Sequence, residues 1–301
     1  MKKIILLMFV VVFSLILFVF NSGAGLVEVK SLEELARPRL IIHCINLPGD
    51  AIYIQLPDAG EILITGAHAD GAKTIISYIE NDFKKRKGRI ASIVQQIISL
   101  RPRIDLLLNT SLDLSSLRNI LDLYKKIEVK RLLSSLSTEV PSKLTDLPQE
   151  LGQFAYLCTF YAPYETIKKG KNVLLPPQER VELTLSVLYP PKEVSYKEYL
   201  SNFRSKQWIE DNFPVLKLSF NKFSFLYIPS ISTSFQDKLL MVDKEDLKSS
   251  LLRISGHPGV ISPDLVKKVE PQILLDDYQF NPSIKSIVFT TDGEKFFLER
   301  R

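Results

Sequence analysis

The chain of 301 residues contains few of the side chains from which catalytic sites are most often built: it has three histidines, two cysteines and twelve glycines. It has no glycine-rich phosphate loop and no G-x-S-x-G motif, which excludes a nucleotide-binding loop and the serine elbow of α/β-hydrolases. No pattern repeats with a period of about 20–50 residues, so a solenoid is excluded. The two cysteines, Cys44 and Cys158, leave two alternatives open: one disulfide bond, if they lie outside the membrane, or two buried free thiols.

The N-terminal segment is strongly apolar. Lys2 and Lys3 precede residues 4–20 (IILLMFVVVFSLILFVF), whose only polar side chain is Ser14, and small residues follow. A basic start, an apolar stretch and then small residues indicate an export signal, and the stretch is at the short end of what spans a bilayer. Residues 1–24 are therefore predicted to be a cleaved signal peptide or a single-pass membrane anchor, with the rest of the chain extracytoplasmic.

The remainder has the composition of a globular protein. Hydrophobic residues make up 46% of the chain and aromatic residues 10%, which is enough for a sizeable core and argues against disorder. Setting aside Lys2 and Lys3 lowers the formal charge from +5 to +3, which is weak support for an anionic partner. We predict a linker at residues 25–37 and one domain at residues 38–301.

Hydrophobic periodicity predicts strands and helices in both halves of this domain. Strands are expected at residues 40–45, 51–56, 61–65, 104–108, 129–133, 153–160, 181–191, 215–220, 223–228, 252–254, 272–277 and 286–300. Helices are expected at residues 72–100, 117–127, 235–251 and 262–269. This order predicts an α/β fold in which two mixed β-sheets pack face to face with helices on the outer faces, an αββα four-layer sandwich.

One loop raises a question about function. Residues 109–116 (NTSLDLSS) join a buried strand to the predicted helix, and such loops often carry the chemistry of α/β proteins. The loop has four hydroxyl groups and one carboxylate, Asp113, but no histidine or cysteine. Ser115 or Ser116 is expected to cap the helix, and Arg118 is expected to pair with an acid, Asp113 or Asp122.

Six segments resemble, in order, the metallo-β-lactamase fold, in particular the extracytoplasmic domain of ComEC-type competence proteins and their stand-alone relatives. The segments are IIHCINLPGDAIYIQLPDAGEILITGA (41–67), NTSLDLSSLRNIL (109–121), SVLYPP (186–191), NFPVLKLSFNKFSFLYIPS (212–230), LRISGHPG (252–259) and TTDGEKFFLER (290–300). The resemblance covers about residues 38–301. It implies a fold whose strand-end loops carry a two-metal hydrolytic site.

In that family the second segment carries a His-x-His-x-Asp-His motif, which binds metal and activates water. Matching the family's ligand positions to this sequence identifies seven vestigial site positions. They are Thr65, Ser111, Asp113, Ser115, Ser116, Ser230 and His257. Only Asp113 and His257 have side chains that transition metals prefer, whereas a two-metal site needs roughly six ligands. The resemblance therefore implies a degenerate site, with no catalytic residue, no bound metal and no small-molecule cofactor.

The leading hypothesis is a catalytically degenerate protein at the cell surface, which binds or scaffolds DNA or an envelope protein and could serve DNA uptake. The alternative is a metal-dependent phosphodiester hydrolase, a ComEC-like nuclease, with unusual ligands. Its site would join His257, Asp113 and His68 around Zn or Mn. His43 lies within an apolar strand and is interpreted as a structural residue, and a loop role is expected for His68.

Overall fold

A computed structural model describes residues 38–68, 70–98, 102–136, 148–160, 164–166, 172–173, 175, 182–189, 193–229, 232–255, 261–276 and 283–301. Side chains are described in these stretches except at residues 87–98, 158–160, 164–166 and 172. The predicted signal or anchor at residues 1–24 and the linker at residues 25–37 lie outside the described residues. Within those residues no helix is both long enough and apolar enough to cross a membrane.

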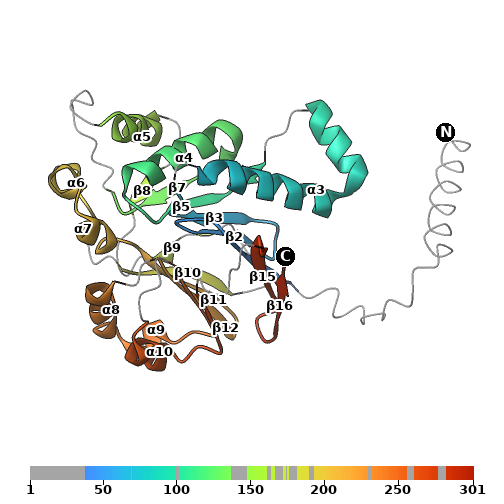
Figure 1. Ribbon diagram of the computed structural model, residues 1–301. Coiled ribbons are helices and arrows are strands. Elements are labelled where there is room, and N and C mark those ends of the chain that lie inside the picture. The colour runs from blue at the N-terminus through green and yellow to red at the C-terminus, as the bar shows by residue number, and fades with distance from the viewer. Residues whose placement is uncertain are drawn as a thin grey trace, which may run out of the picture. The chain divides into compact units, whose positions relative to one another are not determined.

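The domain contains two large mixed sheets (Figure 1). The eight-stranded sheet has the order β16 (Phe296–Arg300), β15 (Ser286–Thr291), β1 (Leu40–Ile45), β2 (Ala51–Gln55), β3 (Glu61–Thr65), β5 (Leu106–Asn109), β7 (Leu132–Ser134) and β8 (Tyr164–Thr166). Its strands from β16 to β3 pair antiparallel, and those from β3 to β8 pair parallel. The strands predicted at residues 40–45, 51–56 and 61–65 are β1, β2 and β3, and they pair consecutively as an antiparallel meander.

The six-stranded sheet has the order β14 (Ile273–Leu275), β13 (Leu251–Ile254), β12 (Phe223–Ile228), β11 (Val215–Phe220), β10 (Leu183–Tyr189) and β9 (Asn172–Val173). A hairpin at Asn221 joins β11 to β12, and Asn221 takes a positive φ of 52° there. A short third sheet pairs β4 (Arg103–Ile104) with β6 (Glu128–Val129).

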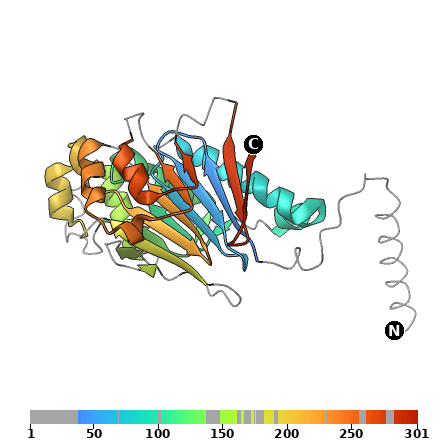
Figure 2. The same cartoon turned by 90° about the horizontal axis from the view of Figure 1, so that it is seen from below.

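Side-chain alternation along the strands builds three apolar layers. In β2, Ile52 and Ile54 belong to the core between the two sheets, whereas Tyr53 faces the opposite way. The outer face of the eight-stranded sheet is covered by α3 (Gly71–Ile98), α4 (Leu114–Lys126) and α5 (Gln149–Phe160), with α6 (Tyr196–Asn202) and α7 (Lys206–Glu210) beside them. The six-stranded sheet is covered by α8 (Thr233–Leu240), α9 (Lys244–Leu247) and α10 (Pro263–Val269). The predicted αββα sandwich is confirmed, and Figure 2 shows its layers from below.

Two predicted elements are wrong. Residues 153–160 form the end of helix α5 rather than a strand, because Leu151, Phe154 and Ala155 pack on the outer face of the sheet. A short apolar run does not distinguish a buried strand from a buried helix. The helix predicted at residues 235–251 is two helices, α8 and α9, since α9 starts afresh where the Asp243 side chain accepts a bond from the Glu245 backbone N–H.

Candidate functional site

The loop that the sequence singled out lies where two parallel strands end. β3 and β5 pair in parallel, with Thr65 opposite Asn109, so the residues that follow both strands share one edge of the sheet. Helix α4 starts there at Leu114. Its N-cap is Asp113, whose Oδ1 accepts a hydrogen bond of 3.0 Å from the backbone N–H of Ser116.

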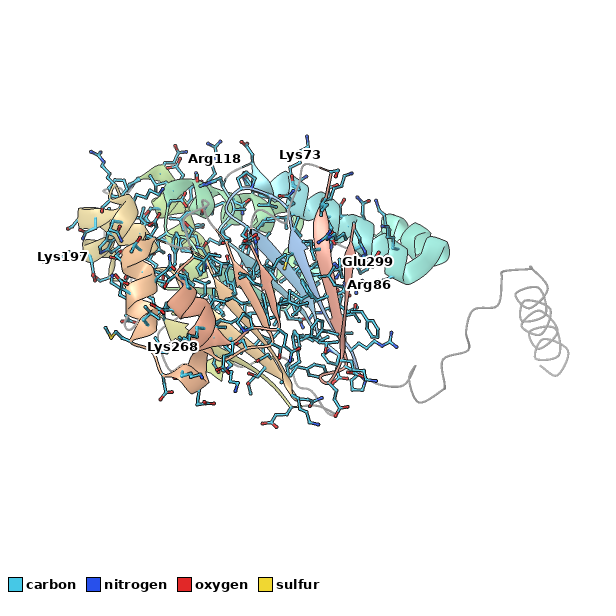
Figure 3. The ribbon with its side chains drawn as sticks, turned by 60° about the horizontal axis from the view of Figure 1, so that its bottom comes forward. Lys73, Arg86, Arg118, Lys197, Lys268 and Glu299 are labelled. Carbon is cyan, nitrogen blue, oxygen red and sulfur yellow. The ribbon has the colours of Figure 1, made fainter. Side chains whose placement is uncertain are left out.

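The prediction that Ser115 or Ser116 caps this helix is therefore wrong. The helix begins one turn earlier than the sequence suggested, and both serines lie within its first turn. The predicted pairing of Arg118 is also wrong. Among the described side chains Arg118 is exposed and forms no ion pair, while Asp122 pairs with Lys125 at 2.7 Å. Figure 3 shows Arg118 at the surface of the molecule.

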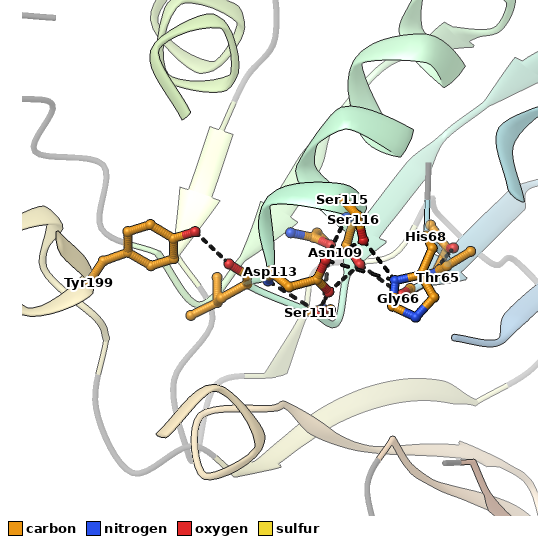
Figure 4. A network of polar contacts seen from close by, with 11 residues as sticks. Thr65, Gly66, His68, Asn109, Ser111, Asp113, Ser115, Ser116 and Tyr199 are labelled. Carbon is orange, nitrogen blue, oxygen red and sulfur yellow. Dashed lines mark hydrogen bonds and ion pairs between the residues drawn. The ribbon is translucent and has the colours of Figure 1, made fainter. Parts of the chain in front are cut away.

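Both oxygens of the Asp113 carboxylate are used within the loop (Figure 4). The Ser115 hydroxyl donates to Oδ1 at 2.5 Å, and the Ser116 hydroxyl lies 2.6 Å from Oδ2. The Ser111 hydroxyl also donates to Oδ2. With the N-cap N–H, four donor groups lie within hydrogen-bond distance of the carboxylate, and the single Ser116 hydroxyl proton is shared between Oδ2 and the carbonyl oxygen of Gly66. The vestigial positions on this loop therefore form one closed polar cluster.

These contacts set the charge state of Asp113. Burial alone would raise its pKa, but the hydrogen bonds from Ser111, Ser115 and Ser116 outweigh burial, and the pKa lies below its usual value. The carboxylate is therefore charged at neutral pH. It fills the helix N-terminus, where the dipole favours a negative group. The Ser116 hydroxyl also lies 2.8 Å from the carbonyl oxygen of Gly66, which ties the loop to the segment after β3.

His68 joins this cluster from the segment that follows β3. Its Nδ1 lies 2.7 Å from the Ser115 hydroxyl oxygen and 3.9 Å from Asp113 Oδ1. The His68 side chain is 59% exposed and that of Asp113 is 28% exposed. The structure thus brings together two of the three residues of the alternative metal site. The third, His257, lies outside the described residues, as does Ser230. Among the residues that are described, no group of three or more His, Cys, Asp or Glu side chains is placed to hold a metal ion.

Thr65, the vestigial position on β3, has a structural role. Its hydroxyl donates to the carbonyl oxygen of Asp50 at 3.2 Å and accepts from the backbone N–H of Ala67 at 3.1 Å. It is fully buried. On the other side of the loop, the Tyr199 hydroxyl of α6 donates to the carbonyl oxygen of Leu112 at 2.7 Å, so helix α6 also fixes the position of the cluster.

An ion pair between the two sheets was not predicted from the sequence. Asp50 precedes β2, and Arg253 lies on β13 between Leu252 and Ile254, whose side chains face the opposite way. Arg253 Nε lies 3.1 Å from Asp50 Oδ2, and the two side chains are 3% and 1% exposed. The available signal was an arginine inside an otherwise apolar strand, LLRI, since a fully buried arginine is rare unless it is paired.

Cys44 lies in the same inter-sheet core. Burial raises the pKa of its thiol to about 12, and the thiol is free. The disulfide alternative therefore does not hold for Cys44, and the reason is topological. Cys44 faces the core between the sheets, whereas helix α5, which carries Cys158, packs on the outer face of the eight-stranded sheet.

His43 is structural, as its strand position predicts, and is only 1% exposed. Its Nδ1 lies 2.9 Å from the Tyr78 hydroxyl, which in turn donates to the Ser286 hydroxyl at 3.0 Å. Burial lowers the pKa of His43 to about 4, although the nearby Asp82 carboxylate opposes this shift. The imidazole is therefore neutral at physiological pH and belongs to the packing between the sheet and α3.

Comparisons with known proteins give distant structural likenesses. No family model matches the sequence, and no curated protein matches it. Among solved structures, CmlA, a diiron β-hydroxylase from Streptomyces venezuelae, aligns at a TM-score of 0.40 and 12% identity, over 79% of this chain and 44% of that chain. Zn2+-bound PqqB from Methylobacterium extorquens aligns at 0.36 and 13%, over 72% of each chain. A long-form RNase Z from yeast aligns at 0.37 and 8%, over 72% of this chain and 32% of that chain.

This chain thus spans less than half the length of CmlA and about a third of the length of the yeast RNase Z. At such identities and TM-scores the activities of these proteins do not transfer to it. The assignment of the four-layer sandwich depends on the strand order and on the helices that cover the two sheets.

Proposed function

We propose that this chain is a catalytically silent protein of the metallo-β-lactamase fold, which acts outside the cytoplasm by binding or scaffolding. The observation that carries the proposal is the closed cluster around Asp113. In a hydrolytic metal site, the loop at this strand end would present free lone pairs to a cation. Here four donor groups of the loop and of the first turn of α4 lie within hydrogen-bond distance of the one carboxylate of the loop.

The donor set supports the same conclusion. Zn2+ and Mn2+ prefer imidazole, thiolate or carboxylate ligands to neutral hydroxyl groups. Of the described side chains in the cluster, only Asp113 and His68 are of these types, and Ser115 lies within hydrogen-bond distance of both. The described residues therefore do not fit a two-metal site, and we derive no hydrolytic step through a metal.

The buried ion pair adds an electrostatic argument. Asp50 connects it to the vestigial site, because its carbonyl oxygen accepts from Thr65 while its carboxylate pairs with Arg253. Because the Arg253 guanidinium pairs with the Asp50 carboxylate, this buried acid needs no metal ion to compensate its charge. In this proposal the protein supplies its own cation to satisfy a buried acid.

The test uses the full chain, purified in detergent without chelators. Elemental analysis is expected to find no stoichiometric transition metal, and chelator is expected to leave the melting temperature unchanged, because no metal stabilises the native state. Activity is measured on DNA and on bis-p-nitrophenyl phosphate with added Zn2+ or Mn2+. The matched variant replaces Ser111, Asp113 and His257 together by Ala.

Two metal ions per chain, or metal-dependent hydrolysis that this triple variant lacks, would contradict the proposal and favour the ComEC-like nuclease. The observation that favours this nuclease as a second candidate is the position of His68 beside Asp113.

The partner and location are part of the proposal. Residues 4–20 would hold or export the chain across the membrane, and the mild positive charge of the remainder is compatible with DNA. A DNA partner predicts affinity that falls steeply with salt concentration. An envelope protein as the partner predicts capture of that protein with no DNA binding at low salt. Cell fractionation and N-terminal sequencing of the mature chain decide between a cleaved signal and an anchor.

A further inference from the structure

Strand β16 forms one edge of the eight-stranded sheet and carries exposed apolar side chains. It follows β15 through the turn at Asp292 and Gly293 and is the last strand in the sheet order. Phe297 is 69% exposed and Leu298 is 41% exposed. Natural edge strands are usually shielded by charges, proline or bulges, because an open edge invites another strand. Figure 2 shows β15 and β16 beside each other at the rim of the domain.

The hydrogen bonds within the hairpin show which groups face the open edge. Ser286 and Arg301 exchange both backbone hydrogen bonds, at 2.9 and 3.1 Å, and Asp292 donates to Lys295 at 3.3 Å. Main-chain groups alternate in direction along an antiparallel strand. The N–H and C=O groups of every second residue, Phe296, Leu298 and Arg300, therefore point away from β15. Nothing in the described part of the chain pairs with that side of β16.

We propose that the occupant of this edge is a second copy of the same chain, paired antiparallel through β16 about a two-fold axis at Phe297. In this register Phe297 faces its own copy, and Leu298 faces Phe296. Glu299 faces Lys295. The Phe297 pair lies on the axis and occurs once, whereas the other two pairs each occur twice because a two-fold interface is isologous. The eight-stranded sheets of the two copies would then form one continuous sheet.

Charge complementarity supports this register. Beyond the Phe297 centre, Glu299 meets Lys295, which directly precedes β16, so charges of opposite sign lie across the axis at two symmetric places. Opposite charges and aromatic pairs directly across an antiparallel pair stabilise it, and like charges destabilise it. Glu299 already accepts a bond of 2.8 Å from Arg301. Pairing across the edge would extend this exposed ion pair into a network with Lys295 of the second copy. Figure 3 shows Glu299 on the edge strand.

The neighbouring register is less favourable. An axis at Leu298 would set Phe297 against Glu299 and Phe296 against Arg300. Each charged side chain would then face an aromatic ring instead of an opposite charge. Registers that differ by an odd number of residues would turn one sheet over, because successive side chains point to opposite faces. The register at Phe297 is thus the one that matches both apolar and charged positions. The contact is one strand long, so we expect a dissociation constant on the order of micromolar or weaker.

The first experiment is a disulfide test in the full chain. In the proposed register Phe297 and its copy form a pair that is not hydrogen-bonded, whose Cα atoms lie about 4.5 Å apart, within the range for a disulfide bond. Phe297→Cys should therefore give a cross-linked dimer on mild oxidation. Glu299→Cys is the matched control on the same strand, because the two copies of position 299 would lie about 14 Å apart. The wild-type chain controls for the native cysteines.

The second experiment reverses charges and measures the dimer by sedimentation over a concentration series. Glu299→Lys sets like charges against Lys295 twice per dimer and should weaken dimerisation roughly tenfold or more. Adding Lys295→Glu to that variant restores opposite charges in exchanged positions and should recover wild-type affinity. Recovery by the double variant separates a lost contact from a damaged fold.

The proposal is overturned if Phe297→Cys cross-links no better than Glu299→Cys, or if the wild-type chain is a monomer throughout the series. It is also overturned if the double variant dimerises no better than Glu299→Lys alone.

Discussion

The buried pair between Asp50 and Arg253 gives the sharpest test of how the two sheets are held together. At 3.1 Å between Nε and Oδ2, two unit charges attract by about 5 kcal/mol at an effective dielectric constant near 20. Desolvation of both groups offsets much of this, so the pair adds little compared with two apolar residues. Removing one partner is different, because it leaves an uncompensated buried charge, which costs about 3–5 kcal/mol.

The experiment is a double-mutant cycle with Asp50→Asn, Arg253→Met and the double variant. Asn is chosen because Asp50 has a φ of 64°, a conformation that Asn tolerates better than other residues. Each single variant should lower the free energy of unfolding by about 3–5 kcal/mol. The double variant should lose clearly less than the sum of the two, with a coupling energy of about 2–3 kcal/mol.

The free energies come from urea denaturation followed by circular dichroism at pH 7, with unchanged m values as the sign that the folded states are comparable. Strict additivity of the two single losses would refute the reasoning. So would a loss below about 1 kcal/mol for Arg253→Met, since the Asp50 carboxylate would then not depend on the guanidinium for its stabilisation.

Three further predictions concern single residues. Asp113→Ala should lower the free energy of unfolding by about 2 kcal/mol, because α4 loses its cap and three hydroxyl groups lose their acceptor. The difference in stability between wild type and variant should shrink as acid protonates the wild-type carboxylate. A difference that stays constant down to pH 2, ~2 units below the usual pKa of an aspartate, would contradict this prediction. The fold lowers the pKa of His43 from 6.5 to about 4. The stability that comes from keeping this imidazole neutral is therefore fully present above pH 6.5 and is lost as the pH falls towards 4. This loss is about 3 kcal/mol in acid titrations, and His43→Phe should remove it. Gly49→Ala should cost more than about 1 kcal/mol, because φ is +82° and a Cβ would lie 2.6 Å from the Gly66 carbonyl oxygen. Ala59→Gly, at a φ of 65°, should instead raise the free energy of unfolding. Both variants are compared with wild type by thermal melts, and a change of the same sign in both would contradict this account.

Much of the fold could be predicted because hydrophobic periodicity is local. The stretches at residues 40–45, 51–56 and 61–65 alternate as strands with turn residues between them, and the structure has β1, β2 and β3 there. The run at 153–160 carries no such local information. Six of its eight residues are apolar without a clear period, and packing against the outer face of the sheet decides that it is a helix.

Part of the candidate site could likewise be predicted from the sequence, and part could not. The sequence identified the loop that contains Ser111, Asp113, Ser115 and Ser116, but it assigned the helix cap to the serines. A carboxylate with three hydroxyl groups within reach is a better acceptor for the helix N-terminus than any one of those hydroxyls. Which residue becomes the N-cap depends on where the helix starts. That start is set by the packing of α4 on the sheet.

By itself the sequence determined the two-sheet architecture, the outer helices and the position of the polar loop, because alternation and turn chemistry act between near neighbours. Only the tertiary structure decided that Asp50 meets Arg253 across 203 positions of sequence, that His68 approaches Asp113, and that Cys44 and helix α5 lie on opposite faces of one sheet. Such contacts depend on sheet order and on which face each side chain takes, and neither is contained in the spacing of residues along the chain.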